Sequence, residues 1–232
     1  MKINIEKAND RGKSDLGWLQ SRFSYSFADY YNPKRSGFGD LRVVNDDIIS
    51  PSKGFGLHQH ENMEIITIVT KGTLSHKDNT GSQGILTPDE VQVMSAGSGV
   101  MHSEYNHSKS EKVELFQIWI QTAKKNAATR YDQKKFDLKK NEIMLVVSGK
   151  EDMKSLFIYQ DAKILLLKID KNKKMYYTLP SKKGLFVMMI EGTSEIADKK
   201  LERRDAIEIS QTKEINIKGL EDSYLLLIEV NV

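Results

Sequence analysis

Four side chains with metal-binding groups occur in two pairs, and one residue separates the members of each pair. His58 and His60 form the first pair, and His102 and Glu104 form the second. Because side chains alternate faces along a β-strand, both members of a pair point the same way in an extended segment. Two facing strands could then bring three imidazoles and one carboxylate together. This donor set suits a borderline divalent transition metal, whereas Mg or Ca prefers oxygen ligands.

An octahedral ion with four protein ligands keeps two open positions, through which substrate and dioxygen can reach it. A lone histidine is more often a hydrogen-bonded structural residue than a ligand. Two pairs at strand spacing, flanked by turn glycines, favour the metal site instead. The two remaining histidines are interpreted differently. His76, beside a hairpin turn, is expected to make a structural hydrogen bond, and His107 is expected to be exposed.

The segments around these pairs have the patterns of β-strands. Residues 64–70 are rich in β-branched side chains, and residues 90–94 and 113–120 alternate apolar with polar ones. Leu41 to Val44 predicts a short strand, followed by a turn at Asn45-Asp46-Asp47. Further strand-like runs cover residues 143–147, 164–169, 185–190 and 224–230. Short strands separated by turns predict an all-β sandwich or barrel.

A repeat suggests that the chain contains two such units. The glycine turns at Gly72 and Gly192 are each followed, after a spacer, by a similar strand pattern. We therefore predict an N-terminal metal-binding domain at 1–131, a junction at 132–140 and a C-terminal domain at 141–232. The polar stretch from 124 to 140 is expected to contain short helical turns. All five histidines lie between positions 58 and 107, and Thr178 stands where the repeat would place His58, so we expect one metal per chain.

Composition excludes several classes of protein. The 232 residues include 39% hydrophobic and 29% charged ones, as in ordinary globular proteins, and no cysteine, which excludes disulfides and cysteine nucleophiles. The net charge of +3 is evenly spread, and the basic runs at 171–174 and 199–204 look like solvated hairpin loops, so nucleic-acid binding is not expected. Without a signal-like or membrane-spanning segment, a cytoplasmic location is expected and membrane association is not.

Two longer motifs carry a family resemblance. The pattern Gly54-Phe-Gly-x-His-x-His-x-x-Met-Glu, followed by Gly99-x-x-His-Ser-Glu-Tyr-Asn, resembles the pirin family of the cupin superfamily. The likeness covers nearly all of residues 1–140, including Ser26 to Pro33 and Leu41 to Asp47, and the remainder weakly. Among pirins, the chain is similar to the bacterial branch with quercetin 2,3-dioxygenase activity. Gln59 departs from the proline that many relatives have between the two histidines, but it leaves the ligands intact.

The resemblance implies a bicupin, in which two β-sandwich barrels of the jelly-roll (double-stranded β-helix) type face each other and only the N-terminal one binds metal. It implies one divalent transition metal, Fe(II) first, with Ni, Cu, Co, Mn or Zn as alternatives. Its ligands would be His58, His60, His102 and Glu104. Glu64, which by strand parity can share the interior with His60, is expected to lie behind the ligands.

The resemblance also implies a reaction. A flavonol such as quercetin would bind through adjacent hydroxyl and carbonyl oxygens, and dioxygen would open its central ring with release of carbon monoxide. Glu104 could take the hydroxyl proton as general base. Several large side chains are either core residues or the lining of an apolar mouth over the metal, namely Met63, Met94, Met101, Phe55 and Trp119.

Two alternatives stay open. The chain could be a metal-binding regulatory or adaptor protein that acts through a protein partner, with flavonol turnover incidental. It could also be a cupin isomerase or epimerase acting on sugars, although a ligand set with open positions argues against that. A monomer is expected, because internal duplication supplies the barrel pairing that many cupins obtain from dimers.

Overall fold

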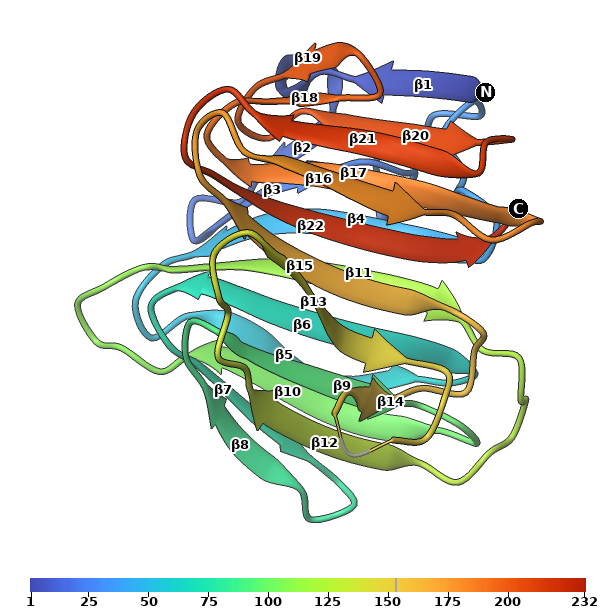
Figure 1. Cartoon of the computed structure of the whole chain (residues 1–232). Helices are drawn as coiled ribbons and strands as arrows, with labels where there is room; N and C mark the ends of the chain where they lie inside the picture. The colour runs from blue at the N-terminus through green and yellow to red at the C-terminus, as the bar shows by residue number, and fades with distance from the viewer. Residues whose placement is uncertain (153) are drawn as a thin grey trace.

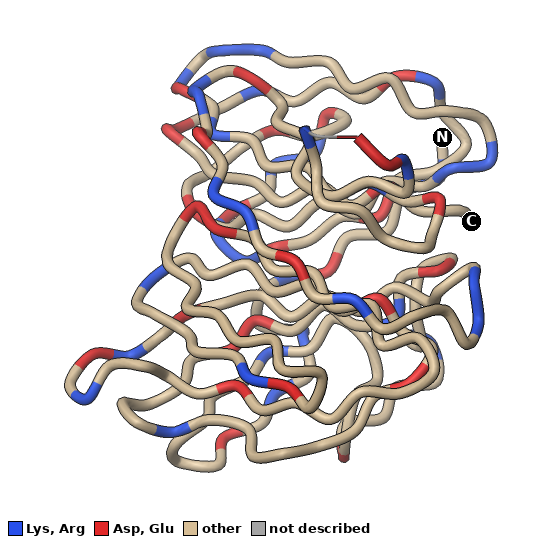
Figure 2. The backbone as a smooth tube through the Cα atoms, turned by 90° about the horizontal axis from the view of Figure 1, so that it is seen from below, with Lys and Arg blue, Asp and Glu red and all other residues tan. Residues whose placement is uncertain are grey.

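The computed structural model describes residues 1–152 and 154–232, and its regular elements are strands apart from the 3-10 turn η1 (Ala8–Asp10). The strands form two seven-stranded and two four-stranded sheets, and the two halves of the chain stack one above the other (Figure 1). No described residue belongs to a helix that is long and apolar enough to span a membrane. Positive and negative residues are interspersed along the backbone (Figure 2).

The N-terminal barrel combines a seven-stranded sheet with a four-stranded one. In spatial order, the larger sheet consists of β12 (Arg130–Lys135), β9 (Glu90–Ser95), β6 (Met63–Lys71), β11 (Val113–Gln121), β4 (Leu41–Ile49), β3 (Leu19–Phe23) and β2 (Gly12–Asp15). The smaller sheet consists of β5 (Gly54–His60), β10 (Val100–Asn106), β7 (Leu74–Asp78) and β8 (Gln83–Leu86).

The C-terminal barrel repeats this arrangement. Its larger sheet consists of β1 (Lys2–Glu6), β20 (Ala206–Ser210), β17 (Lys183–Glu191), β22 (Ser223–Asn231), β15 (Lys163–Ile169), β13 (Glu142–Ser148) and β14 (Leu156–Phe157). Its smaller sheet consists of β16 (Lys174–Thr178), β21 (Glu214–Gly219), β18 (Ser194–Ile196) and β19 (Lys199–Leu201). All-β architecture with two barrels, as predicted, is confirmed.

The matching strand orders confirm the repeat inferred from the sequence. The series β9-β6-β11-β4 recurs as β20-β17-β22-β15, and β5-β10-β7-β8 recurs as β16-β21-β18-β19. The two turn glycines also match, with φ of +77° at Gly72 and +80° at Gly192. One element crosses between the units, because β1 at the N-terminus pairs with β20. The proposed boundaries at 131 and 141 stay a prediction.

The apolar residues form separate clusters on the two faces of the larger sheets. Side chains from both seven-stranded sheets pack in one cluster between the barrels, including Phe116 and Ile66 from the first and Phe186 and Ile228 from the second. Inside the C-terminal barrel the apolar core is a single cluster. Inside the N-terminal barrel it is divided into two smaller clusters. The first barrel therefore has a polar centre where the second is filled with apolar side chains.

Three local expectations were wrong. Asn45-Asp46-Asp47 is not a turn but the middle of β4, where Asp46 lies 3.3 Å from the Arg204 guanidinium and 3.5 Å from that of Arg11. Arg204, the last residue of the basic run 199–204 that was expected to be a solvated loop, is accordingly buried. The stretch after residue 124 does not form helical turns, because residues 130–135 form β12 and pair with β9. In each case a tertiary partner outweighs the local preference of the sequence.

Candidate metal centre

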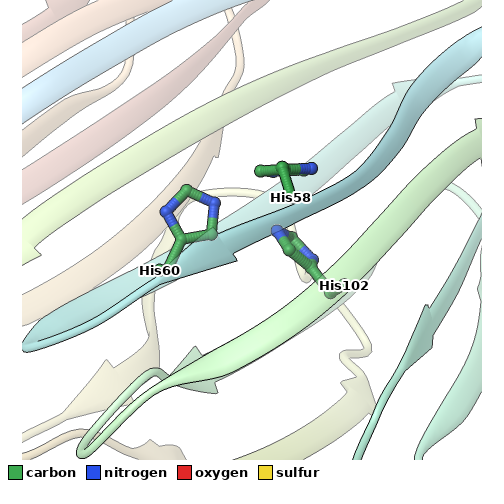
Figure 3. Close-up of side chains that lie close together, drawn as sticks. All are labelled: His58, His60 and His102. Carbon is green, nitrogen blue, oxygen red and sulfur yellow. The ribbon is translucent and has the colours of Figure 1, made fainter.

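The three histidines of the two motifs meet on neighbouring strands of one sheet. β5 and β10 run antiparallel, and their register sets His58 opposite His102 and His60 opposite Val100. The three imidazoles turn toward one another (Figure 3). Their ring centroids lie 4.4 Å apart for His58 and His102, 4.8 Å for His58 and His60, and 4.9 Å for His60 and His102. One ring nitrogen of each lies within 4.8 Å of the others, close enough for a single ion.

The free nitrogens of these rings are positioned to accept a cation. Nδ1 of His58 lies 2.7 Å from the Gly56 carbonyl oxygen, which keeps the proton on Nδ1 and leaves the Nε2 lone pair free. Nε2 of His102 is buried and has no hydrogen-bond partner in the described part of the chain. A buried polar atom without a partner is rare in folded proteins, and an ion at this position would satisfy it.

Electrostatics keep the imidazoles in the form that binds metal. Burial and the neighbouring His58 lower the pKa of His60 to about 4. Burial also lowers the pKa of His102 to about 4, although the Glu104 carboxylate opposes the shift. Both rings are therefore neutral at pH 7, and a neutral imidazole offers its lone pair to a metal without first releasing a proton. The residues present fit a divalent transition metal.

Glu104 groups with His102 and His76 rather than with all three motif histidines. Its ligand atom shares a second group with His76 and His102, within 4.8 Å, and is not part of the group that contains His58 and His60. A register shift between His102 and Glu104 interrupts the pairing of β10 with β5. The structure thus brings together three of the four predicted ligands, and the ligand role of Glu104 stays a prediction.

The carboxylate of Glu104 is buried and surrounded by donors. Gln117 Nε2 donates to its Oε2, and Gln92 Nε2 donates to its Oε1 at 3.0 Å. Burial alone would raise the pKa of Glu104, but the hydrogen bond from His76 and the electrostatic interactions with His102 and His76 outweigh it and lower the pKa to about 2. The side chain is thus ionised at neutral pH. No motif pointed to the two glutamines, which come from β9 and β11.

His76 makes the structural hydrogen bond that was predicted and also reaches the site. Its Nε2 lies 3.3 Å from Asp78 Oδ2, its Nδ1 lies 3.4 Å from His102 Nδ1, and its ring stacks on Tyr131 at 4.5 Å between centroids. One residue separates His76 from Asp78 on β7, as in the two motif pairs. The spacing that marks a possible site was therefore present in the sequence. His107 is exposed, as expected.

Glu64 faces away from the histidines, and the expectation that it shares the interior with His60 was wrong. Its neighbour Ile65 lines the barrel interior, so Glu64 points to the opposite face of β6, where it accepts a hydrogen bond from Ser95 Oγ at 2.6 Å. The reason is that His60 ends β5 in one sheet while Glu64 is the second residue of β6 in the other. Strand parity does not carry across the turn between them.

The three histidines and Glu104 line a cleft of about 340 Å³. Its apolar lining is formed by Leu16, Leu19, Phe23, Phe27, Phe55, Ile65 and Trp119. Of the side chains considered for an apolar mouth, Phe55 and Trp119 take that position, whereas Met63 and Met94 belong to a core cluster and Met101 is exposed. Trp119 also meets the His60 ring edge to face, with 4.8 Å between centroids. The cleft is thus lined mainly by apolar and aromatic side chains, as small-molecule sites usually are.

Known proteins resemble this chain over nearly its whole length. The Pirin family model matches residues 4–120, and the model for the quercetinase C-terminal cupin domain matches residues 145–230. A quercetin 2,3-dioxygenase from Escherichia coli K12 is 36% identical over 228 residues, which cover 98% of each chain. A pirin-like protein from Caulobacter vibrioides is 37% identical over 221 residues, covering 94% of this chain and 95% of that one.

The fold comparison agrees with the sequence comparison. The crystal structure of the bacterial pirin YhhW from Escherichia coli in complex with nickel(II) superposes with a TM-score of 0.95 at 36% identity, and 99% of each chain is covered. A metal-bound relative with the same fold and the histidine group described above both support a divalent metal in this chain. Matches that span both barrels, in sequence and in structure, place the protein in the pirin family of bicupins.

Proposed function

We propose that this protein is a metal-dependent dioxygenase that opens the central ring of flavonols such as quercetin. The observation that carries the proposal is the group of His58, His60 and His102, which lies in an apolar cleft with one buried nitrogen unpartnered in the described chain. A cleft of about 340 Å³ falls at the lower end of the size range of small-molecule sites. The name of the Escherichia coli relative supports the same reaction.

His58, His60 and His102 would hold the ion, and we assign Glu104 as the fourth ligand. A bound divalent transition metal would supply Lewis acidity toward the flavonol oxygens and access to dioxygen. We propose Fe(II) as the native ion, with Ni, Cu, Co, Mn or Zn as alternatives. The nickel complex of the relative supports a transition metal rather than one particular ion.

The other groups of the site orient the substrate and exclude water. Phe23, Phe55 and Trp119 provide apolar ring surfaces against which a planar flavonol can stack, with its adjacent hydroxyl and carbonyl oxygens turned toward the histidines. Gln92 and Gln117 hold the Glu104 carboxylate in place. With a pKa of about 2, Glu104 is a weak base, which favours a ligand role over that of general base.

A turnover assay tests the proposal. The metal-free protein is reconstituted with each ion and mixed with quercetin in air, and the loss of the flavonol absorbance band is followed together with dioxygen consumption. We expect turnover that disappears with a chelator and falls by at least about 1,000-fold in His58→Ala, since one ligand of the ion is removed. His107→Ala, an exposed histidine, should keep full activity. An unchanged flavonol band with every metal would refute the proposal.

A further inference from the structure

A group of polar side chains lies across the cleft from the histidines. Ser21 on β3 and Asn45 and Asp47 on β4 line the cleft from the seven-stranded sheet, whereas the histidines line it from the four-stranded sheet. We call these three residues the polar wall. Each is at most 4% exposed, and the backbone register sets Ser21 directly opposite Asp47. The polar wall is thus a built part of the cleft and not a surface feature.

Two atoms of the polar wall lack a partner within the described chain. Oδ1 of Asn45 and Oδ1 of Asp47 are buried and make no hydrogen bond. Ser21 hydrogen-bonds Asp47, so only part of that carboxyl group is satisfied. Leaving such oxygens unpaired costs stability, and folded proteins usually avoid it except where a ligand or water completes the bonding. Both atoms belong to residues that line the cleft.

Asp46, the residue between Asn45 and Asp47, is fully paired, so a polar side chain in this segment can find partners. Asp46 stands between them on β4 but points to the other face of the sheet, where it lies within 3.5 Å of two arginines. Alternation along the strand thus separates one structural carboxylate from two cleft residues. The residues that the structure describes supply no hydrogen-bond partner for either of the two cleft oxygens.

We propose that Asn45 and Asp47 recognise hydroxyl groups on the aromatic rings of the substrate, on the side away from the oxygens that face the histidines. The inference rests on the proposed function and names the specificity-determining residues of that same site. Both unpaired atoms are hydrogen-bond acceptors, and the donors that a flavonol offers are its O–H groups. The apolar lining accepts the rings, while the polar wall selects their hydroxyl pattern.

The chemistry of Asp47 supports this role. Burial, with the nearby Asp46 and Glu104 charges, raises its pKa to about 7, although the Ser21 hydrogen bond and Arg11 oppose the shift. A carboxyl group in this environment gains from a ligand hydroxyl that bonds to its charged form. A site built to pair with substrate hydroxyls also discriminates against analogues that lack them, because its buried polar groups are then left unpaired.

The test compares two flavonols that differ in ring hydroxyls. The full chain is loaded with Zn(II), and dissociation constants are measured without dioxygen by fluorescence quenching. 3-Hydroxyflavone has a single hydroxyl group, the one that lies next to the carbonyl oxygen and is turned with it toward the histidines. Quercetin has this hydroxyl and further ones on its other rings. We expect the unmodified protein to bind quercetin about 10-fold or more tightly than 3-hydroxyflavone.

Asn45→Leu and Asp47→Leu, which keep the approximate volume of the side chains, should each weaken quercetin binding about 10-fold and change the affinity for 3-hydroxyflavone less than about 3-fold. Retained binding of 3-hydroxyflavone shows that a variant is folded and loaded, and either variant alone suffices. Asp10→Asn, an exposed acid outside the cleft, should change neither constant.

Equal affinities of the unmodified protein for the two flavonols would overturn the inference, as would a preference for quercetin that survives both substitutions. These outcomes are independent of catalysis, because the Zn(II) complex is assayed without dioxygen. Quercetin turnover in air by the reconstituted protein, with no role for the polar wall in binding, would leave the proposed function standing and refute only the inference.

Discussion

At the scale of single residues, the site depends on a chain of contacts that begins behind the ligands. Asp78 contacts His76, and His76 contacts Nδ1 of His102, whose other nitrogen is buried without a partner in the described chain. Partners behind a ligating imidazole fix its orientation and tautomer, and their loss typically weakens metal binding 10- to 100-fold. His76 is thus expected to position His102 without touching the ion itself.

His76→Phe tests this role, since phenylalanine can keep the stacking on Tyr131 but cannot hydrogen-bond. We expect metal affinity to fall by about 10- to 100-fold, measured by competition with a chromophoric chelator. His107→Ala removes an exposed histidine and serves as the control. Equal affinities of His76→Phe and the unmodified protein would show that the contact with His102 does not orient the ligand.

At the scale of elements, the site depends on how closely β5 approaches β10. Gly54 begins β5, and a Cβ atom placed there would lie 2.1 Å from the Glu104 carbonyl oxygen and 2.5 Å from Tyr105 Cα. Both are backbone atoms, so the strands themselves would have to separate. That movement would disturb the register that sets His58 opposite His102.

Gly54→Ala is therefore expected to lower the free energy of unfolding by about 1 to 3 kcal/mol and to weaken metal binding. Denaturant unfolding of the metal-free protein and chelator competition measure the two effects. Gly56→Ala on the same strand is the matched control, because the nearest atom to its added Cβ is the Tyr105 hydroxyl at 3.8 Å. If both variants behave alike, close strand approach is not what aligns the histidines.

The arrangement of the strands explains which features could be predicted from the sequence and which could not. Alternation with period two and runs of β-branched residues correctly located several strands and both motif pairs, because these patterns reflect which face of a strand is buried. The segment from Asn45 to Asp47 was mistaken for a turn, since its composition is typical of turns and its partners lie on distant strands. Gln92 and Gln117 were missed because their partner, Glu104, lies on another strand. Sequence rules fail where polar residues are placed in a strand for the site rather than for the fold.

At the scale of the whole molecule, the two barrels share one apolar core between their larger sheets. Residues of both halves pack in this cluster, β1 at the N-terminus completes the C-terminal sheet, and Asp46 of one barrel lies 3.3 Å from Arg204 of the other. Apolar burial across such an interface makes the folding of each barrel dependent on the other. The metal site in one barrel is thus coupled in stability to a barrel that carries no histidine.

We therefore expect the metal-free protein to unfold in a single cooperative transition. Both tryptophans, Trp18 and Trp119, belong to the N-terminal barrel, so their fluorescence reports on that unit alone, whereas far-ultraviolet circular dichroism reports on the strands of both. The two probes should give the same urea midpoint, and added metal should raise both midpoints together. At a free metal concentration of 100 times the dissociation constant, the free energy of unfolding should increase by about 2.7 kcal/mol. A fluorescence midpoint that moves with metal while the dichroism shows a second, unmoved transition would mean that the barrels fold independently.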